Sequence, residues 1–343
     1  MKRKKIAFYP YEKKNSNSMN LYVKNIEKIL ENKGTLYSYD YGLKSIGSML
    51  KCKYIFLNWY ENGVTLFDYC TLILARLLRK KIVWTFHNKI PHDSCNLVQE
   101  KKKIFFMSRI STHILILSKH SRKELYRISG EQVASKVVYV PHINYCNDYK
   151  PTNCNEEVKK IESEFTFLYF GQIRPYKNIE VLIRAFAEMK GKCAKLIIAG
   201  KPYDAEYAKK IRDMCINCFR IVLDYRFIPD QKVYDYMQSA DVVILPYNKQ
   251  SSMNSGAMIA AFSCRKPVIV PDIAMARDYS NKEYVYMYHY QNQEQHIKEL
   301  SRVMQQVYLQ GKEKNRKLGE QAYLDVKEKN SSEEVTRCLS VVW

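Results

Sequence analysis

Short runs of β-branched and aromatic residues alternate along this chain with segments of helical periodicity, and this alternation restricts the fold more than any other feature of the sequence. In the first half, strands are predicted at residues 5–10, 53–59, 81–86, 113–118 and 137–141. Helices are predicted between them, including one over residues 17–30. This order indicates a parallel sheet with helices on both faces, so we predict an α/β fold.

A polar and charged stretch at residues 144–164 interrupts the alternation, which then starts again. We interpret this stretch as the connection between two domains. The second series of predicted strands covers residues 167–170, 194–200, 220–223, 226–229, 241–246 and 267–270. At 343 residues the chain is long enough for two cores. We predict doubly wound, Rossmann-like domains over residues 1–150 and 151–311, and a charged helical tail over 312–343 that packs back towards the first domain.

The sequence carries 56 Lys and Arg residues against 35 Asp and Glu residues, a net charge of +21, so the protein is expected to bind polyanions. Nucleic acid, an anionic membrane surface and phosphorylated substrates are the candidate partners. Basic runs occur at residues 2–5, 79–81 and 101–103. A single run is typical of a solvated surface, but three runs in the first third of the chain indicate a surface there that faces a membrane.

The predicted helix at residues 71–78, TLILARLL, has two interpretations, a core helix and a helix that touches a membrane surface, of which we favour the first. The sequence shows no signal peptide and no apolar segment of the roughly 18 residues that a membrane span needs. We therefore expect a cytoplasmic protein, peripheral to the inner face of the cell membrane, with reduced cysteines. Cys215 and Cys218 form a CxxC without a partner pair, so we expect no metal there.

The densest cluster of acid and base groups follows the predicted strand at residues 81–86 and comprises His87, His92 and Asp93. In an open α/β sheet, ligands bind outside the carboxyl ends of the strands. The structural alternatives are a hydrogen bond from His87 to loop backbone and a helix cap at Asp93. We favour a functional role because position and chemistry agree. We expect a general base here, with Asp93 first, His92 second and His87 third.

A short basic loop connects the predicted strand at residues 167–170 to a helix and carries Arg174 and Lys177. The two cations then lie beside the backbone N–H groups and the positive dipole end of that helix, an arrangement that binds phosphate. The alternative is that both are ordinary surface charges. We favour a phosphate site.

A second anion-binding turn is predicted at Asn254, Ser255 and Gly256, at the start of a helix over residues 256–263. Gly256 permits close approach of the backbone, and Ser255 supplies a hydroxyl. One such turn is weak evidence, because every helix has an N-terminus. Two in one domain predict a diphosphate site, since Arg gives bidentate contacts to phosphate and Lys a point charge.

Several nucleotide and metal motifs do not occur in the sequence. It contains neither GxxxxGK[ST] nor GxGxxG, which argues against an ATPase and a dehydrogenase. It also contains no Asp-x-Asp pair to hold a divalent metal on a diphosphate. We therefore expect neither a metal nor another cofactor, with cationic side chains and helix dipoles stabilising the diphosphate instead.

Four segments of the second half, in this order, resemble the C-terminal nucleotide-sugar domain of the group 1 (family four-like) GT-B glycosyltransferases. They are FGQIRPYKNIEVLIRAF, LIIAG, RFIPDQKVYDYMQSADVVILPY and SGAMIAAFSCRKPVIVPD. The first half is similar more loosely, through WTFHNKIPHD, LSKHSRKEL and VPH. The resemblance implies a GT-B fold, in which two Rossmann-like domains face a cleft, the first binding the acceptor and the second the nucleotide-sugar.

The same resemblance implies roles for individual residues of the second domain. Arg174 and Lys177 correspond to residues that bind the donor diphosphate. The turn at Asn254, Ser255 and Gly256 corresponds to one that lies by the phosphates. The residues implied near the nucleobase are Arg226, Phe227, Ile228 and Asp230.

One departure from the family pattern concerns the donor sugar. Members usually carry two glutamates, eight positions apart, that contact the donor sugar and the ribose. Aligned on residues 266–269, this chain has Ser252 and Ala260 at those positions. Its SGA loop resembles a subgroup found among bacterial exopolysaccharide and capsule transferases, some of which are mannosyltransferases.

We therefore expect a transferase that moves a sugar from a UDP- or GDP-sugar, GDP-mannose among them, to a hydroxyl of a glycan linked to a polyprenyl diphosphate. A nucleic-acid-binding protein with a basic cleft is one alternative. A non-catalytic relative of the transferases is the other. We expect no specific nucleic-acid partner, because only a few cations are predicted in the cleft.

Overall fold

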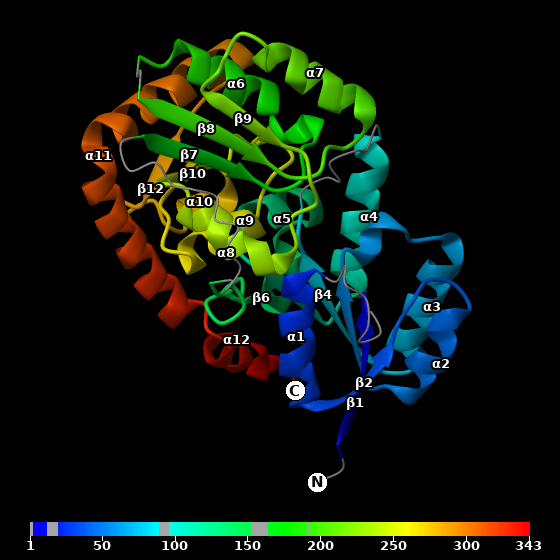
Figure 1. Cartoon of the computed structure of the whole chain (residues 1–343). Helices are drawn as coiled ribbons and strands as arrows, with labels where there is room; N and C mark the ends of the chain where they lie inside the picture. The colour runs from blue at the N-terminus through cyan, green and yellow to red at the C-terminus, as the bar shows by residue number, and fades with distance from the viewer. Residues whose placement is uncertain (1–2, 12–19, 89–95, 152–163, 191–192) are drawn as a thin grey trace. The chain divides into compact units, whose positions relative to one another are not determined.

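A computed structural model describes residues 3–11, 20–88, 96–151, 164–190 and 193–343. The chain forms two compact units, which can be followed by colour in Figure 1. The N-terminal unit comprises Met1–Ile143 together with Asn330–Trp343, and the C-terminal unit comprises Asn144–Lys329. The chain therefore leaves the first unit after Ile143 and returns to it after Lys329.

The N-terminal unit contains six parallel strands in the order β2-β1-β3-β4-β5-β6. They are β1 (Lys4–Tyr9), β2 (Gly34–Ser38), β3 (Tyr54–Asn58), β4 (Lys81–Phe86), β5 (His113–Ile116) and β6 (Val137–Tyr139). The strands predicted in this half are confirmed, and β2 is an additional one. It lies at the edge of the sheet, where most of its residues are partly or fully exposed, so the apolar run that marks the other strands is weak.

Helices cover both faces of this sheet. They are α1 (Leu21–Glu31), α2 (Lys44–Lys51), α3 (Leu66–Leu77), α4 (Leu97–Ile110), α5 (Ser121–Ser129) and α12 (Ser332–Leu339), with 3-10 segments η1 (Tyr60–Asn62), η2 (Glu131–Lys136) and η4 (Ser340–Val342). The β1–β2 connection crosses the sheet in one direction and the later connections cross in the other. Because such crossovers are right-handed, α1 lies on one face, and α2, α3, α4 and α5 lie side by side on the opposite face.

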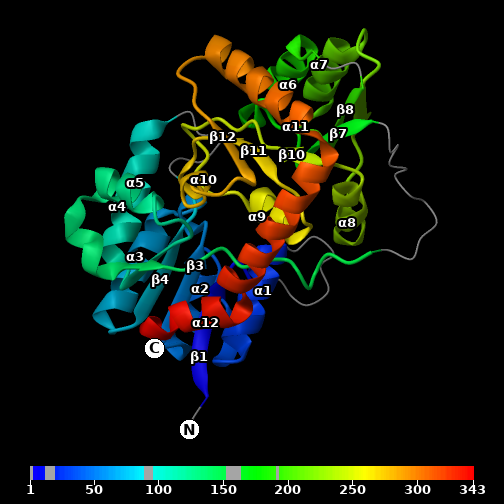
Figure 2. The same cartoon turned by 90° about the vertical axis from the view of Figure 1, so that its left-hand side faces the viewer.

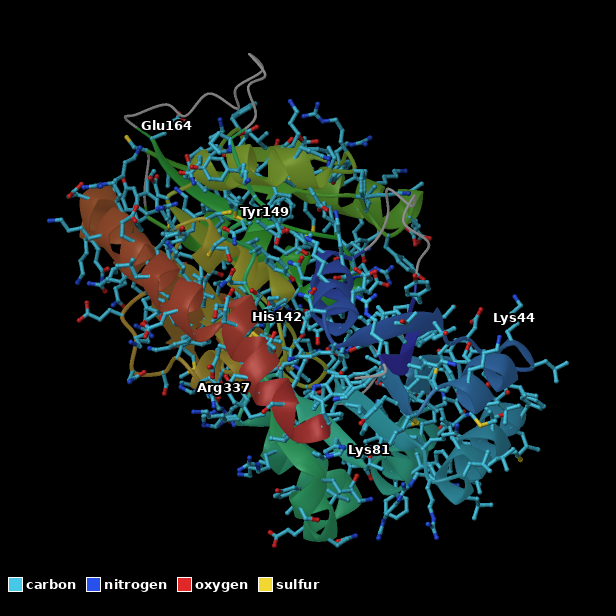
Figure 3. The ribbon with its side chains drawn as sticks, turned by 90° about the horizontal axis from the view of Figure 1, so that it is seen from below. Lys44, Lys81, His142, Tyr149, Glu164 and Arg337 are labelled. Carbon is cyan, nitrogen blue, oxygen red and sulfur yellow. The ribbon has the colours of Figure 1, made fainter. Side chains whose placement is uncertain are left out.

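The C-terminal segment Asn330–Trp343 belongs to the core of this unit. The ring of Trp343 packs against Tyr54 of β3, with 4.8 Å between ring centroids. Lys81, labelled in Figure 3, donates from Nζ to the carbonyl of Val342 at 3.0 Å. Helix α12 contacts both α1 and β6. The end of the chain therefore covers part of the sheet that its beginning forms.

Helix α3 begins earlier than the predicted residue 71 because Thr65 and Asp68 form a capping box. The Thr65 hydroxyl accepts from the backbone N–H of Asp68, whose carboxylate accepts from the backbone N–H of Thr65 at 2.9 Å. The buried face of the helix consists of Asp68, Thr71, Leu72 and Ala75. Its other large aliphatic residues and Phe67 are exposed, so the core-helix interpretation is wrong for the outward face. Within the described part of the chain, no helix combines the length and the apolarity that crossing a bilayer requires.

The C-terminal unit contains a second sheet of six parallel strands, in the order β12-β11-β10-β7-β8-β9. They are β7 (Phe165–Phe170), β8 (Ala194–Ala199), β9 (Ile221–Asp224), β10 (Val242–Ile244), β11 (Val268–Pro271) and β12 (Val285–Tyr288). The strand predicted at residues 226–229 is wrong: these residues form a loop, in which Arg226 turns back and bonds to the Asp224 carboxylate. Strand β12 was not predicted.

The helices of this unit are η3 (Pro175–Lys177, a 3-10 turn), α6 (Ile179–Glu188), α7 (Ala205–Cys215), α8 (Asp230–Gln238), α9 (Gly256–Ser263), α10 (Ala274–Arg277) and α11 (Gln293–Lys329). Helices α6 and α11 pack against each other, and both contribute to the core beside β7. Figure 2 shows the length of α11, from orange to red. Central core residues include Phe167, Leu182, Phe186, Leu196 and Met304.

Helix α11 is interrupted at Gly311, where φ is 78°. The side chain of the buried Asn315 bridges the interruption. Its Nδ2 donates to the carbonyl of Val307 at 3.2 Å and to the carbonyl of Gly311 at 2.8 Å. Beyond it, Gly319 packs directly on the backbone that follows α9: a Cβ at this position would lie 2.0 Å from the carbonyl oxygen of Arg265. The second half of α11 can approach α9 only because Gly319 has no side chain.

Gly319→Ala is therefore expected to lower the free energy of unfolding by about 1–3 kcal/mol, since an added methyl forces well-packed backbones apart. Gly47 of α2 is the matched control, because it is also helical but has no heavy atom within 4 Å of its Cβ position. Gly47→Ala is expected to stabilise the protein by about 0.5–1 kcal/mol through helix propensity. Chemical denaturation measures both effects. An unchanged stability of Gly319→Ala would contradict the close packing.

Candidate functional site

The C-terminal unit presents its connecting loops along one edge of its sheet. Strands β10, β7, β8 and β9 are adjacent and parallel, so the loops that follow them emerge side by side in that order. Ser255 follows β10, Arg174 and Lys177 follow β7, and Arg226 follows β9. The predicted diphosphate ligands thus lie on neighbouring strands. The predicted nucleobase residues follow a strand two positions from β7, about 10 Å away at the usual strand spacing.

The loop after β7 presents its cations at the start of α6. Arg174 is extended, with φ −128°, and precedes the turn η3. Asn178 then adopts a left-handed conformation with φ 55°, which Asn tolerates better than most residues and which turns the chain into α6. The Arg174 guanidinium carbon lies 5.1 Å from the ring centroid of Tyr203, a cation–π contact from the neighbouring loop.

Lys177 is held against an aromatic ring. Its Nζ lies 3.8 Å from the ring centroid of Tyr247. Burial, together with the positive charge of Arg174, lowers the pKa of the Lys177 ammonium to about 7. The group is therefore only partly protonated at neutral pH, and an anion placed beside it would favour the protonated form.

Tyr247 connects Lys177 to the second predicted turn. Its hydroxyl lies 3.1 Å from the Oγ of Ser255. Ser255 caps α9, accepting a hydrogen bond from an N–H of the first turn, with Asn254 before it and Gly256 as the first helical residue. The two predicted turns are therefore brought together through one tyrosine. Sequence reasoning missed Tyr247, although it lies in the loop after β10, where site residues are expected.

The two loops are also joined through the backbone, since the N–H of Asn248 donates to the carbonyl of Tyr176 at 3.3 Å. Ser252 and Ala260, at the positions where relatives carry glutamates, are both buried. The Ser252 hydroxyl has no hydrogen-bond partner among the described residues. The carboxylates usual in the family are thus replaced by small side chains on either side of the turn at Asn254.

The predicted nucleobase residues lie in and after the loop that follows β9. Arg226 is held by a bidentate ion pair with Asp224, with Nε–Oδ1 at 2.9 Å and Nη2–Oδ2 at 2.7 Å. The pair lowers the pKa of the Asp224 carboxyl to about 2. Phe227 is 68% exposed and Ile228 is partly exposed, while Asp230 is the first residue of α8. The loop therefore offers an aromatic face to solvent beside a fixed cation.

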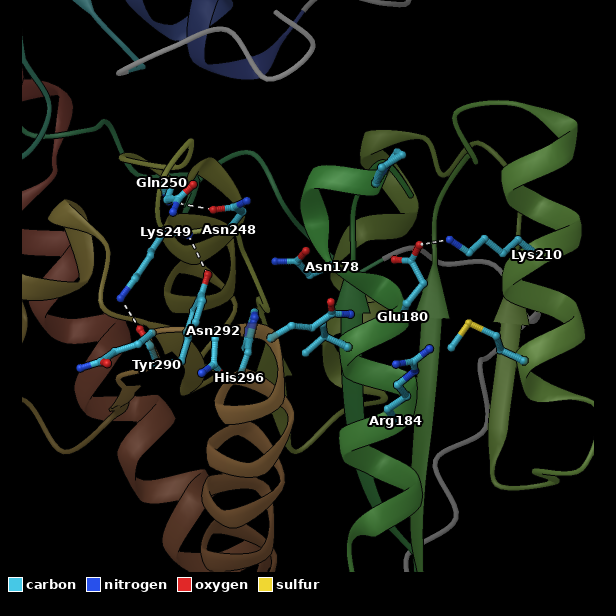
Figure 4. A pocket seen from close by; sticks show the side chains of 15 residues that line it. Asn178, Glu180, Arg184, Lys210, Asn248, Lys249, Gln250, Tyr290, Asn292 and His296 are labelled. Carbon is cyan, nitrogen blue, oxygen red and sulfur yellow. Dashed lines mark hydrogen bonds and ion pairs between the residues drawn. The ribbon is translucent and has the colours of Figure 1, made fainter. Parts of the chain in front are cut away.

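A pocket of about 430 Å³ opens beside the first turns of α6 and α11 (Figure 4). Its polar lining includes Asn178, Glu180, Arg184, Lys210, Lys249 and His296. Lys210 forms an ion pair with Glu180 at 3.0 Å. Neither Arg174 nor Lys177 lines this pocket. The pocket is therefore separate from the predicted diphosphate ligands, although it borders the loop that carries them.

In the N-terminal unit, the structure describes one of the three base candidates. His87 is buried at the end of β4, stacked on Trp59 with 3.8 Å between ring centroids, and its Nε2 lies 3.1 Å from Oδ1 of Asn58. Burial lowers the pKa of the His87 imidazole well below its ordinary value, so the ring is neutral at pH 7. His92 and Asp93 lie outside the described residues.

Glu61 is a buried carboxyl that sequence reasoning missed. It lies in η1, directly after β3, and accepts a hydrogen bond from Nε1 of Trp84 at 2.8 Å. Burial raises the pKa of the Glu61 carboxyl to about 7. Its signal in the sequence was its position just beyond a largely apolar strand, the same criterion that selected His87.

A model of the family described as "Glycosyl transferases group 1" matches residues 153–325, just over half of the chain. The chain belongs to the group 1 glycosyltransferases. The match includes the Arg174–Lys177 loop and the Asn254–Gly256 turn. Membership favours a transferase over the nucleic-acid-binding alternative.

Two curated bacterial enzymes are similar to part of this glycosyltransferase. The "GDP-mannose:glycolipid 4-beta-D-mannosyltransferase" of Xanthomonas campestris pv. campestris is 29% identical over 104 residues, which cover 30% of this chain and 29% of that enzyme. The "Lipopolysaccharide 1,2-N-acetylglucosaminetransferase" of Salmonella typhimurium is 30% identical over 128 residues, which cover 33% of this chain and 32% of that enzyme. The chain thus matches about a third of the length of each.

Solved structures resemble the whole chain at low sequence identity. Anabaena HepE in complex with UDP and glucose superposes with a TM-score of 0.73 at 12% identity, over 99% of this chain and 98% of HepE. Sucrose-phosphate synthase from Thermosynechococcus elongatus superposes with a TM-score of 0.73 at 14% identity, over 99% of this chain and 98% of the synthase. WaaG, a glycosyltransferase involved in lipopolysaccharide biosynthesis, superposes with a TM-score of 0.65 at 13% identity, over 98% of this chain and 99% of WaaG. The predicted GT-B fold is confirmed.

Burial of Glu61 is expected to make the stability of the glycosyltransferase pH-dependent. Its pKa is raised from an ordinary 4.5 to about 7, so from pH 4.5 to 7 the unfolded state ionises first and the folded state is progressively disfavoured. We expect Glu61→Gln, which keeps an acceptor for Trp84, to raise the free energy of unfolding at pH 8 by about 2–3 kcal/mol and to change it little at pH 5. Denaturant titrations at both pH values measure this. An equal effect at both would contradict it.

Proposed function

We propose that this group 1 glycosyltransferase moves a sugar from a UDP- or GDP-sugar to a hydroxyl of a lipid-linked glycan during synthesis of a bacterial surface polysaccharide. The observation that carries the proposal is the contact chain from Lys177 through Tyr247 to Ser255, which unites two anion-binding elements on neighbouring strands. The activities named for the two curated relatives, on a glycolipid and on lipopolysaccharide, support the acceptor class. UDP in the HepE complex supports a nucleotide donor.

In this proposal the diphosphate of the donor lies against the start of α9 and beside Arg174 and Lys177. As the glycosidic bond to the nucleotide breaks, negative charge develops on the leaving diphosphate, and fixed cations stabilise it. Ser255 and the first N–H groups of α9 add hydrogen-bond donors and a positive dipole end. Arg226 and Phe227 then face the nucleobase. No resident metal is part of this proposal.

The acceptor-activating base is proposed to come from the N-terminal unit. If transfer inverts the anomeric centre, a base must take the proton of the acceptor hydroxyl as it attacks. The candidates stay in the order Asp93, His92 and His87. For His87, burial keeps the imidazole neutral and so able to accept a proton, although the lowered pKa makes it a weak base.

The acceptor is proposed to be a glycan on a polyprenyl diphosphate, reached by an enzyme that is peripheral to the cytoplasmic face of an anionic membrane. The substitution of Ser252 and Ala260 for the usual glutamates supports a donor-binding mode that depends more on the diphosphate than on the sugar hydroxyls. The same substitution motivates the remaining alternative, a non-catalytic relative that binds the nucleotide without turning it over.

A thermal-shift screen against UDP, GDP, ADP and CMP tests the donor class, because a ligand present at 100 times its Kd stabilises the fold by about 2.7 kcal/mol. A shift with UDP or GDP alone supports the proposal. Release of UDP or GDP from UDP-glucose and GDP-mannose then separates a working enzyme from a non-catalytic relative. The absence of a shift with all four nucleotides would contradict the proposal.

Arg174→Ala is expected to lower donor turnover at least about a hundredfold, the scale of removing one principal stabiliser of developing charge. Arg184→Ala is the matched control, since Arg184 is an exposed cation further along α6. The control is expected to keep near-normal turnover. Near-normal turnover of Arg174→Ala, or an equal loss in both variants, would contradict the assignment.

Affinity for UDP or GDP is expected to fall as pH rises above 7. The unliganded site deprotonates near pH 7, whereas a bound diphosphate keeps Lys177 charged, so binding takes up a proton and weakens by up to about tenfold per pH unit. Calorimetry measures the affinity from pH 7.5 to 9. In this range the phosphate itself, with a second pKa of about 6, is already ionised and does not contribute to the pH dependence. The control Lys177→Met should bind more weakly and with little pH dependence. A parallel fall in the variant would assign the pH dependence to another group.

A further inference from the structure

Helix α3 turns an apolar face towards solvent. Its exposed large apolar residues are Leu66, Phe67, Ile73, Leu74, Leu77 and, just after the helix, Leu78. Spacings of three, four and seven residues among them put them on one side of the helix. Leu66 and Leu77, at the two ends, are 79% and 75% exposed. Most of the large apolar residues of the helix thus face solvent, while its buried face includes the polar residues Asp68 and Thr71.

The neighbouring helices extend this surface. Helices α2 and α4 both contact α3, on the same face of the sheet (Figure 1). Leu50 of α2 is 56% exposed, and Val98 of α4 is 65% exposed. We call the exposed side chains of α2, α3 and α4 the α2–α4 face. Exposed apolar groups that are contiguous over three helices indicate a binding surface rather than the scattered exposure of ordinary proteins.

All exposed charge on this face has one sign. The exposed cations of the three helices are Lys44, Lys51, Arg76, Lys101, Lys102 and Arg109. Their two carboxylates, Asp68 and Glu100, are both buried. Asp68 accepts from the backbone of Thr65, and Glu100 pairs with Lys103 at 2.9 Å. Figure 3 labels Lys44 at the start of α2. The face therefore combines apolar side chains with an uncompensated positive charge.

We propose that the α2–α4 face is the surface with which the protein docks on an anionic lipid bilayer. The leucines and Ile73 would enter the boundary between headgroups and acyl chains, and the surrounding lysines and arginines would contact lipid phosphates. A second copy of the chain fits this face poorly, because a two-fold interface would bring its cations against the same cations. The proposal extends the membrane part of the proposed function and does not depend on the donor.

Sedimentation of the full chain with vesicles tests the proposal. We expect binding to vesicles of phosphatidylcholine with about a third phosphatidylglycerol, little binding to pure phosphatidylcholine, and weaker binding in high salt. The variant Leu66→Gln/Ile73→Gln/Leu77→Gln changes only exposed side chains and should lower partitioning at least about tenfold. The control Phe219→Gln/Leu309→Gln/Leu324→Gln removes three large, exposed apolar groups from the C-terminal unit and should bind as the unchanged protein does.

Three outcomes would overturn the proposal. The first is that the unchanged protein does not bind anionic vesicles, and the second is that the α3 variant and the control lose vesicle binding equally. The third is that the unchanged protein is a dimer and the α3 variant a monomer, which light scattering would detect. The UDP and GDP thermal shifts are measured on the same samples. If the unchanged protein shows nucleotide shifts but no vesicle binding, the membrane surface alone is contradicted, whereas vesicle binding without any nucleotide shift contradicts the donor proposal alone.

Discussion

The parallel pairing of β7 with β10 is the interaction on which the candidate site depends. Phe167 lies opposite Val242, and Leu168 opposite Val243. Because both strands run in the same direction, the loops that follow them must emerge at the same edge, however far apart they are in sequence. The buried apolar strands thus determine which polar loops meet, while contributing no polar group themselves. Tyr247 is the side chain that turns this proximity into contact.

The contact has an electrostatic cost in the unliganded protein. Lys177 and Arg174 are like charges from one short loop, and burial of Lys177 removes water that would otherwise stabilise its ammonium. The ring face of Tyr247 compensates only in part. A site built in this way is arranged for an anion before the anion arrives, which is the condition under which fixed charges stabilise a transition state most effectively.

Sequence periodicity predicted most of the strands closely, because they are buried and apolar, and α9 has the predicted bounds. It did not indicate β2, whose edge position leaves it partly exposed. Nor did it show the orientation of α3, because a helix that is apolar on most sides does not reveal which side faces water. Arg174, Lys177 and Ser255 were found from charge and helix-start chemistry. Tyr247 was not, because one among 28 tyrosines carries no distinguishing pattern.

The return of the chain to its first unit has a consequence for biosynthesis. The strands that Trp343 and α12 cover are made before the C-terminal unit, but the segment that covers them is made after the whole of that unit. Until then the aromatic surface around Tyr54 lacks its native partner. The N-terminal sheet therefore reaches its native packing only after synthesis of the second unit, so the first unit to begin is completed after the second.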